Sequence, residues 1–197
     1  TGTALSPETI LAAYEAVEEL GGMLVVDEAY AEFARDPDTT ALSLLPGRPR
    51  LVVSRTMSKA FALAGARVGY FAADPAVVEA VMLVRLPYHL SAVTQAVALT
   101  ALRHRDQLLG QVGRIREQRD RIVTRLEQLG LEPAASDSNF VFFGGLSDAQ
   151  GLWEDLLGDG VLIRDVGIPG HLRVTAGTEE ETTVFLDSLE RHLPDRR

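Results

Sequence analysis

The 197-residue chain contains no cysteine, so neither a disulfide framework nor a thiolate metal site is expected, which fits a reducing compartment. It also lacks an apolar run long enough to cross a bilayer, so no membrane-spanning helix is expected. Positive charge is scarce, because 19 Lys and Arg face 28 Asp and Glu and leave a net charge of −9. A phosphate backbone needs a basic surface, so nucleic acid is not an expected partner. These absences leave a globular protein with one good core or two small ones.

Lysine is the other scarce residue, because Lys59 is the only one and the remaining 18 cations are arginines. Arginine serves equally well for solubility and surface ion pairs, but its guanidinium stays protonated. A lysine amine can be deprotonated by its surroundings and can then form a Schiff base. A bias toward arginine with one lysine surviving by chance explains the count equally well, so the neighbours of Lys59 must decide.

Two apolar runs predict buried parallel strands near this lysine. Residues 23–26 form a run that ends abruptly in Asp27, and residues 51–54 form a second run that leads into the lysine loop. Open α/β sheets bind ligands at the carboxyl ends of their strands, so Asp27 and Lys59 are expected at one edge. An apolar run ending in Asp-Glu is also typical of a Walker B strand, but the glycine-rich loop of that class is missing.

The residues around the lysine carry donors that suit a phosphate group. Thr56 and Ser58 offer hydroxyls before it, and Arg67 offers a guanidinium after it, flanked by Gly65 and Gly69. The glycines are expected to let the backbone come close to a neighbouring group. The alternative for Ser58 is a helix cap.

The rest of the chain alternates helices and strands. A long helix over residues 106–129 is expected to connect two domains, residues 1–110 and residues 111–197. Residues 31–49 are expected to be mostly loop, and a helical turn is expected over 61–64. The remaining expected helices cover 7–20, 75–85, 91–101, 148–157 and 179–192, and the expected strands cover 67–72, 140–143, 161–164 and 172–175.

Several motifs resemble those of the fold-type I aminotransferases, which use pyridoxal 5′-phosphate (PLP). They are Asp27-Glu28-Ala29-Tyr30, Ser58-Lys59-Ala60-Phe61, Ala64-Gly65-Ala66-Arg67-Val68-Gly69, Pro87-Tyr88-His89-Leu90-Ser91 and Leu172-Arg173-Val174-Thr175-Ala176-Gly177-Thr178. Within that family the sequence is most similar to the histidinol-phosphate aminotransferases. The resemblance implies an α/β fold, with a mostly parallel large-domain sheet covered by helices on both faces. Residues 1–110 would be the C-terminal part of this PLP-binding domain, and residues 111–197 a small C-terminal α+β domain.

The same resemblance implies roles for individual residues. Lys59 would form the Schiff base with PLP and move the substrate proton, and Asp27 would keep the pyridine nitrogen protonated. Tyr30 would donate to the cofactor O3′, its alternative being a core or rim tyrosine. The phosphate would be held by Ser58 and Arg67, and by Thr56.

The small domain would supply the substrate-binding residues. Arg173 matches the arginine that holds a substrate anion in the family, and Arg164 would assist it. The alternative for Arg164 is an ordinary surface residue. Asn139 is a further family-like position near the substrate, with a turn residue as its alternative. The four histidines show no metal-ligand spacing, and no metal is expected.

The implied reaction is the transamination of L-histidinol phosphate with 2-oxoglutarate to imidazole-acetol phosphate and glutamate, in histidine biosynthesis. A cytoplasmic homodimer is the implied form. Thr1-Gly2-Thr3 is similar to the end of an Asn-Pro-x-x-Pro-Thr-Gly segment, which implies that the family's N-terminal part precedes it. Aromatic amino-acid transamination, phosphothreonine decarboxylation, and an inactive fragment or non-catalytic α/β module stay open.

Overall fold

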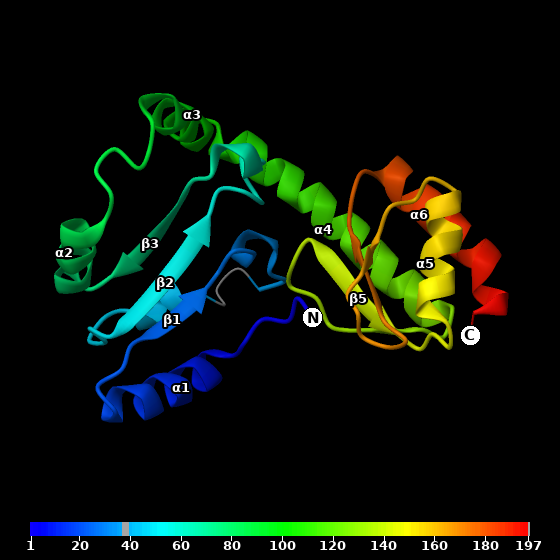
Figure 1. The fold of residues 1–197 in the computed structure, drawn as a ribbon, viewed down its shortest axis with the longest axis horizontal. Helices are drawn as coiled ribbons and strands as arrows, with labels where there is room; N and C mark the ends of the chain where they lie inside the picture. The colour runs from blue at the N-terminus through cyan, green and yellow to red at the C-terminus, as the bar shows by residue number, and fades with distance from the viewer. Residues whose placement is uncertain (37–39, 197) are drawn as a thin grey trace. The chain divides into compact units, whose positions relative to one another are not determined.

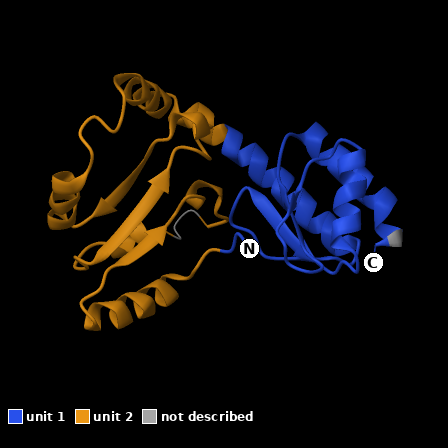
Figure 2. Ribbon diagram, viewed as in Figure 1, with its two compact units in different colours: residues 1–3, 111–197 blue, residues 4–110 orange. Residues whose placement is uncertain are grey.

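The computed structural model describes residues 1–36 and 40–196. They form two compact units, one of Ala4–Gly110 and one of Thr1–Thr3 with Gln111–Arg197 (Figure 2). Which of them corresponds to a PLP-binding domain stays a prediction. The middle of the expected loop 31–49, at residues 37–39, lies outside the described residues.

The 4–110 unit is built on a three-stranded sheet in the order β1-β2-β3 (Figure 1). β1 (Leu24–Asp27) pairs in parallel with β2 (Leu51–Thr56), and β2 pairs antiparallel with β3 (Gly69–Ala73). Because β1 and β2 run the same way, their carboxyl ends open onto one edge of the sheet. That edge carries Asp27 and the segment after Thr56.

The helix α1 (Pro7–Glu19) forms where its capping residues predict it. The Ser6 hydroxyl accepts the Thr9 N–H at 3.2 Å, and Pro7 occupies the first helical turn. Ile10 and Tyr14 are the buried residues of the helix, and Ile10 joins the cluster that covers Leu24 and Val26 of β1.

The expectation that β1 is buried on both faces is wrong for this chain. Leu24 and Val26 pack against α1 and the 3-10 helix η2 (Ala41–Leu44), whereas Val25 on the other face is 61% exposed. Helix α2 (Pro75–Val84) is apolar almost throughout, yet none of its described residues is buried. The apolar residues of β1 and α2 therefore include surfaces that the described residues do not cover.

The remaining elements of this unit differ from the expectations at their ends. The third strand begins at Gly69 rather than at position 67, because Arg67 is in the left-handed conformation with φ of 51°. The short helical turn is η3 (Ala64–Ala66), three residues later than expected. The other elements are η1 (Ala31–Phe33) and α3 (Ala92–Arg103).

The second unit is a four-stranded antiparallel sheet in the order β4-β5-β7-β6. One face of β5 (Phe140–Gly144) and β7 (Leu172–Thr175) carries Val141, Phe143, Leu172 and Val174, which join a core with the helices. The helices are α5 (Ala149–Gly158), α6 (Glu179–His192) and the part of α4 (Arg105–Gln128) that follows Gly110. The strands β4 (Glu132–Pro133) and β6 (Arg164–Asp165) and the 3-10 helix η4 (Leu193–Asp195) complete the unit.

The expected strand over 161–164 is wrong, because only Arg164 and Asp165 pair with a neighbouring strand. In the part of the chain that the structure describes, no helix combines the length and hydropathy needed to span a membrane.

Candidate functional site

The lysine loop, residues 57–68 after β2, buries three apolar side chains and leaves polar side chains accessible. Met57, Ala60 and Phe61 are buried, whereas Ser58 is half-buried and Lys59 is exposed. Backbone bonds close the loop on itself, including Leu63 N–H to the Met57 carbonyl at 3.0 Å. The buried apolar residues and the backbone hydrogen bonds therefore fix the position of the loop that carries the exposed Lys59 amine.

The displayed amine lies beside one of the other expected site residues. Lys59 Nζ is 5.6 Å from the centroid of the Tyr30 ring, within the range of a cation–π contact. Tyr30 comes three residues after Asp27, whose Oδ1 accepts the Ala29 N–H at 3.0 Å. The carboxylate, the phenol and the amine therefore share the carboxyl edge of β1 and β2, as the sequence predicts.

The expected phosphate-binding side chains lie in the same loop. The Thr56 Oγ1 accepts the Ser58 N–H at 3.1 Å, which leaves the Thr56 hydroxyl proton available to an anion. Ser58 does not cap a helix, because no helix of the structure starts there. Arg67 is exposed, and its Nη1 donates to the Ala64 carbonyl at 3.1 Å.

Backbone strain concentrates in this loop. Ala62 and Arg67, with φ of 54° and 51°, are two of the three described non-glycine residues with positive φ. Such conformations cost energy and cluster at ligand-binding sites, where the surrounding structure holds them. Gly69 supports the loop differently, since a Cβ there would lie 2.5 Å from the Arg55 carbonyl oxygen. Gly65 has no such neighbour, so the close approach expected at both glycines occurs only at Gly69.

A partly buried ion pair that the sequence analysis missed fixes the end of β1. Glu28 accepts from Arg55 Nε and Nη2 at 3.0 and 2.8 Å, from the Thr40 hydroxyl at 2.8 Å and from the Ala41 N–H at 2.5 Å. Burial lowers the pKa of Arg55, but its bonds to Glu28 and the attraction of that carboxylate outweigh burial and raise the pKa. The only signal for this role in the sequence was that Glu28 directly follows Asp27 at the end of the apolar run.

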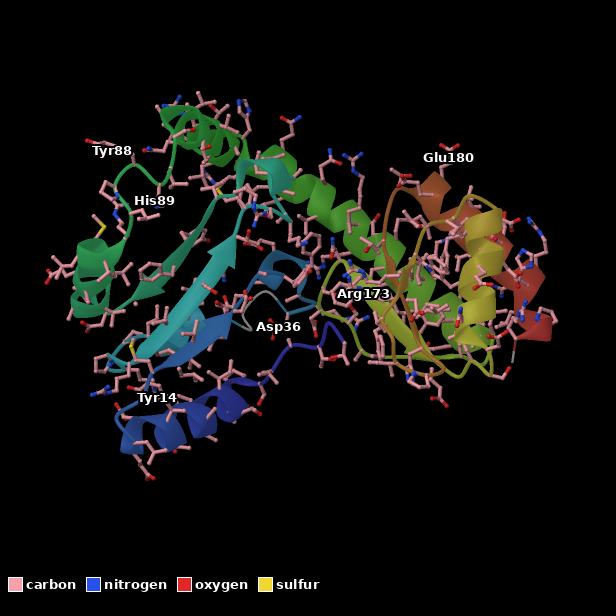
Figure 3. All side chains as sticks on the ribbon, in the orientation of Figure 1. Tyr14, Asp36, Tyr88, His89, Arg173 and Glu180 are labelled. Atoms are coloured by element: carbon pink, nitrogen blue, oxygen red, sulfur yellow. The ribbon has the colours of Figure 1, made fainter. Side chains whose placement is uncertain are left out.

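The expected substrate arginines lie on the 111–197 unit, directly opposite each other. Arg164 of β6 is the register partner of Arg173 of β7. Like charges at such positions repel, since their Cβ atoms lie about 5 Å apart. Neither arginine has an ion-pair partner among the described residues, and the buried Nε of Arg173 has no hydrogen-bond acceptor there. This arrangement has the donors and the unbalanced charge of an anion-binding site (Figure 3 labels Arg173).

Asn139 lies in the bend before β5, as its turn alternative predicts. Its carbonyl accepts the Ala176 N–H at 2.9 Å, which extends the pairing of β5 with β7. The described residues contain no group of His, Asp and Glu side chains that could hold a metal ion.

Comparison with known proteins adds the family. The sequence model described as aminotransferase class I and II matches residues 1–189 of this chain. The chain belongs to the class I and II aminotransferase family. The family expected from the motifs is thereby confirmed.

Individual relatives of this aminotransferase chain agree. It is 67% identical to the histidinol-phosphate aminotransferase of Paenarthrobacter aurescens over 190 residues, which are 96% of this chain and 51% of that protein. The enzyme of the same name from Frankia casuarinae is 63% identical over 194 residues, which are 98% of this chain and 49% of that protein. This aminotransferase chain thus spans about half the length of the curated relatives it matches.

A solved structure gives the same result for the fold. Histidinol-phosphate aminotransferase from Sinorhizobium meliloti, solved in complex with PLP, superposes with a TM-score of 0.86 at 29% identity. The match covers 99% of this chain and 55% of that one. The expected fold class is therefore confirmed, although the sheet of the 4–110 unit in this aminotransferase chain contains one parallel and one antiparallel strand pair.

Proposed function

We propose that this chain carries the lysine half of a PLP-dependent aminotransferase. Its favoured substrates are L-histidinol phosphate and 2-oxoglutarate, and its products imidazole-acetol phosphate and glutamate, in histidine biosynthesis. The observation that carries the proposal is the contact of the only lysine with Tyr30, at the sheet edge that Asp27 closes. The 67% identity to a histidinol-phosphate aminotransferase supports the choice of substrate.

The residues present at this edge fit PLP by their chemistry. An amine, a carboxylate and a phenol lie at one end of the sheet, and the adjacent loop offers the hydroxyls of Thr56 and Ser58. Arg67 in the same loop has a left-handed backbone, and strained conformations of this kind cluster at ligand-binding sites. PLP supplies an electron sink for a substrate that has lost its Cα proton.

The chain's own groups then have distinct tasks. Lys59 would hold the cofactor covalently, and its amine, once freed, would take the proton from the substrate Cα as a general base. Asp27 would keep a proton on the ring nitrogen by placing a negative charge beside it. Tyr30 would donate a hydrogen bond to the cofactor phenolic oxygen. Ser58, Arg67 and Thr56 would bind the cofactor phosphate.

The opposed arginines complete the proposal on the substrate side. A transaminase must hold an anionic group on both of its substrates, and Arg173 with Arg164 provides two guanidinium groups that lack a counter-ion among the described residues. We assign them the phosphate of the amino donor and a carboxylate of 2-oxoglutarate. Asn139, at the start of β5, is the third residue that we assign to the substrate.

The decisive experiment is PLP titration of the 197-residue chain, followed by absorbance and borohydride reduction. We expect a saturable band near the visible edge and mass spectrometry that locates the reduced adduct on Lys59. The Lys59→Ala variant should lose the band, whereas Arg164→Gln, in the other unit, should keep it. Non-saturable behaviour of the wild-type chain would support the inactive-fragment alternative, and an unchanged covalent band in Lys59→Ala would reject the assignment.

The substrate needs a separate experiment. The assay uses a protein that has the full length of the relatives and contains this chain. Its turnover of histidinol phosphate should exceed its turnover of phenylalanine. A preference for phenylalanine, or release of CO₂ from phosphothreonine, would replace the substrate assignment and leave the cofactor assignment intact.

We further propose a homodimer that works in the cytoplasm on small-molecule substrates. The exposed apolar residues of α2 support a covered surface there, because Leu83 and Val84 are 87% and 81% exposed. Sedimentation of the full-length protein should give the mass of two chains.

A further inference from the structure

The face of the β5–β7 sheet opposite the helices carries an aromatic group under the proposed anion site. The guanidinium Cζ of Arg173 lies 4.6 Å from the centroid of the Phe140 ring. Phe140 is 7% exposed, although it belongs to the face that the core residues Val141 and Phe143 do not share. A buried phenyl ring on that face therefore serves Arg173 rather than the helical core.

Hydrogen bonds hold the backbone of Phe140 rigidly. The Ser136 hydroxyl donates to the Phe140 carbonyl at 2.5 Å, and the Phe140 N–H donates to Ser138 Oγ at 3.3 Å. Both serines are buried, at 0% and 1% exposure. The fully buried Arg119 donates from Nη1 to the Ser138 carbonyl at 3.2 Å, which fixes the bend from beneath.

The ring itself is also confined. A Cβ on Gly2, whose φ is +82°, would lie 3.1 Å from Cε2 and 3.2 Å from Cζ of Phe140. The Gly2 carbonyl accepts the Asp137 N–H at 2.8 Å, so the glycine stays against the ring. Phe140 thus has a fixed backbone and little room for another rotamer.

We infer that Phe140 is a positioning residue that holds the Arg173 guanidinium in the orientation that binds the substrate anion. A cation over an aromatic face is attracted by the ring, and this attraction grows as water is removed. The contact also offsets the repulsion from Arg164, which lies directly opposite Arg173 on the other neighbouring strand. The Nε of Arg173, buried without an acceptor among the described residues, then remains ready for the incoming anion. The inference rests on the anion site of the proposed function, not on its PLP chemistry.

The test is a phosphate titration of the ¹⁵N-labelled 197-residue chain, read from the Nε–Hε signal of Arg173. That signal is assigned by its loss in Arg173→Gln. We expect Phe140→Leu to weaken binding of inorganic phosphate about three- to tenfold. Phe143→Leu is the matched control, since it makes the same change on the same strand but on the core face. It should lower Tm and leave the phosphate Kd unchanged.

A double-mutant cycle separates positioning from a merely structural role. For all variants of the cycle the phosphate Kd is measured by isothermal titration calorimetry, because the Arg173 signal is absent from the Arg173→Gln proteins. If Phe140 acts through Arg173, the Phe140→Leu change should cost no further affinity in an Arg173→Gln background. Equal affinity of wild type and Phe140→Leu, or an undiminished loss in that background, would overturn the inference. If Phe140→Leu does not fold, Phe140→Met keeps nearly the same volume without the aromatic face and takes its place.

Failure of this inference and failure of the proposed function give different results. A wild-type chain that binds no phosphate removes the anion site and the role of Phe140 together, while the Lys59 absorbance still tests the cofactor assignment. A chain that binds phosphate but forms no adduct with PLP leaves the Phe140 result valid.

Discussion

The most informative stability experiment concerns the ion pair between Glu28 and Arg55, at the end of β1. Glu28→Gln keeps the shape of the side chain but removes its charge and turns one acceptor oxygen into a donor. The side chains of Glu28 and Arg55 are only 9% and 16% exposed, so the arginine would keep a buried charge without its main counter-ion. Breaking a buried pair costs 3–5 kcal/mol, and the amide oxygen retains part of the network, so we expect a loss of about 3 kcal/mol.

Urea unfolding followed by far-UV circular dichroism measures this loss. With a slope of about 2 kcal/mol/M, the midpoint should fall by ~1.5 M. Exchange of the Ala41 amide, which donates to Glu28, should accelerate as well. Glu32→Gln is the matched control, because its carboxylate lies 3.6 Å from Arg55, against 2.8 Å for Glu28, and should therefore contribute less to stability. A Glu28→Gln protein as stable as wild type would refute the reasoning. So would a Glu28→Gln/Arg55→Met double variant that is no more stable than Glu28→Gln alone.

Two further predictions concern acid stability and glycine packing. Hydrogen bonds from Ser188 and then His192 lower the pKa of Asp159, so its stabilising effect is present above the unfolded pKa and is lost as pH falls through the folded one. Asp159→Asn should therefore flatten the pH dependence of unfolding below about pH 4, and an unchanged slope in acid titration of the variant would count against it. Gly69→Ala should cost about 2–4 kcal/mol, because its Cβ would meet the β2 backbone at 2.5 Å. Gly65→Ala should stay within about 1 kcal/mol of wild type, and equal urea midpoints for the two alanine variants would contradict this account.

Local signals predicted much of the fold from the sequence. The Ser6-Pro7 start and the 3.6-residue apolar period define α1, and the same reasoning defines α5 and α6. These signals suffice because a helix makes its backbone hydrogen bonds within its own segment.

Strand predictions failed where the outcome depended on a partner. The apolar run that begins at Val161 favours a strand, but only Arg164 and Asp165 pair with β7. The apolar run before Asp27 indicates burial, yet Val25 is exposed. The local sequence does not specify which other residues will cover the strand. Propensity describes what a segment needs, whereas pairing and coverage depend on distant residues.

The candidate site divides in the same way. Asp27, Tyr30 and Lys59 could be placed at one sheet edge from the sequence, because each follows one of two apolar runs that form parallel neighbours; their roles stay predictions. The facing of Arg164 and Arg173 could not, since it depends on the register of two strands. Phe140 was assigned only to a strand, because its contact with Arg173 arises from a diagonal pairing between β5 and β7.

The accessibility of Lys59 has a practical consequence. Its ε-amine is the only one in the sequence and lies exposed on a loop whose anchors are buried. Reductive methylation with ¹³C-formaldehyde would therefore give this chain a single dimethyl-lysine resonance, at the spot where chemistry is expected. Such a probe would report ionisation, ligand arrival and solvent access at one atom, without any engineered substitution.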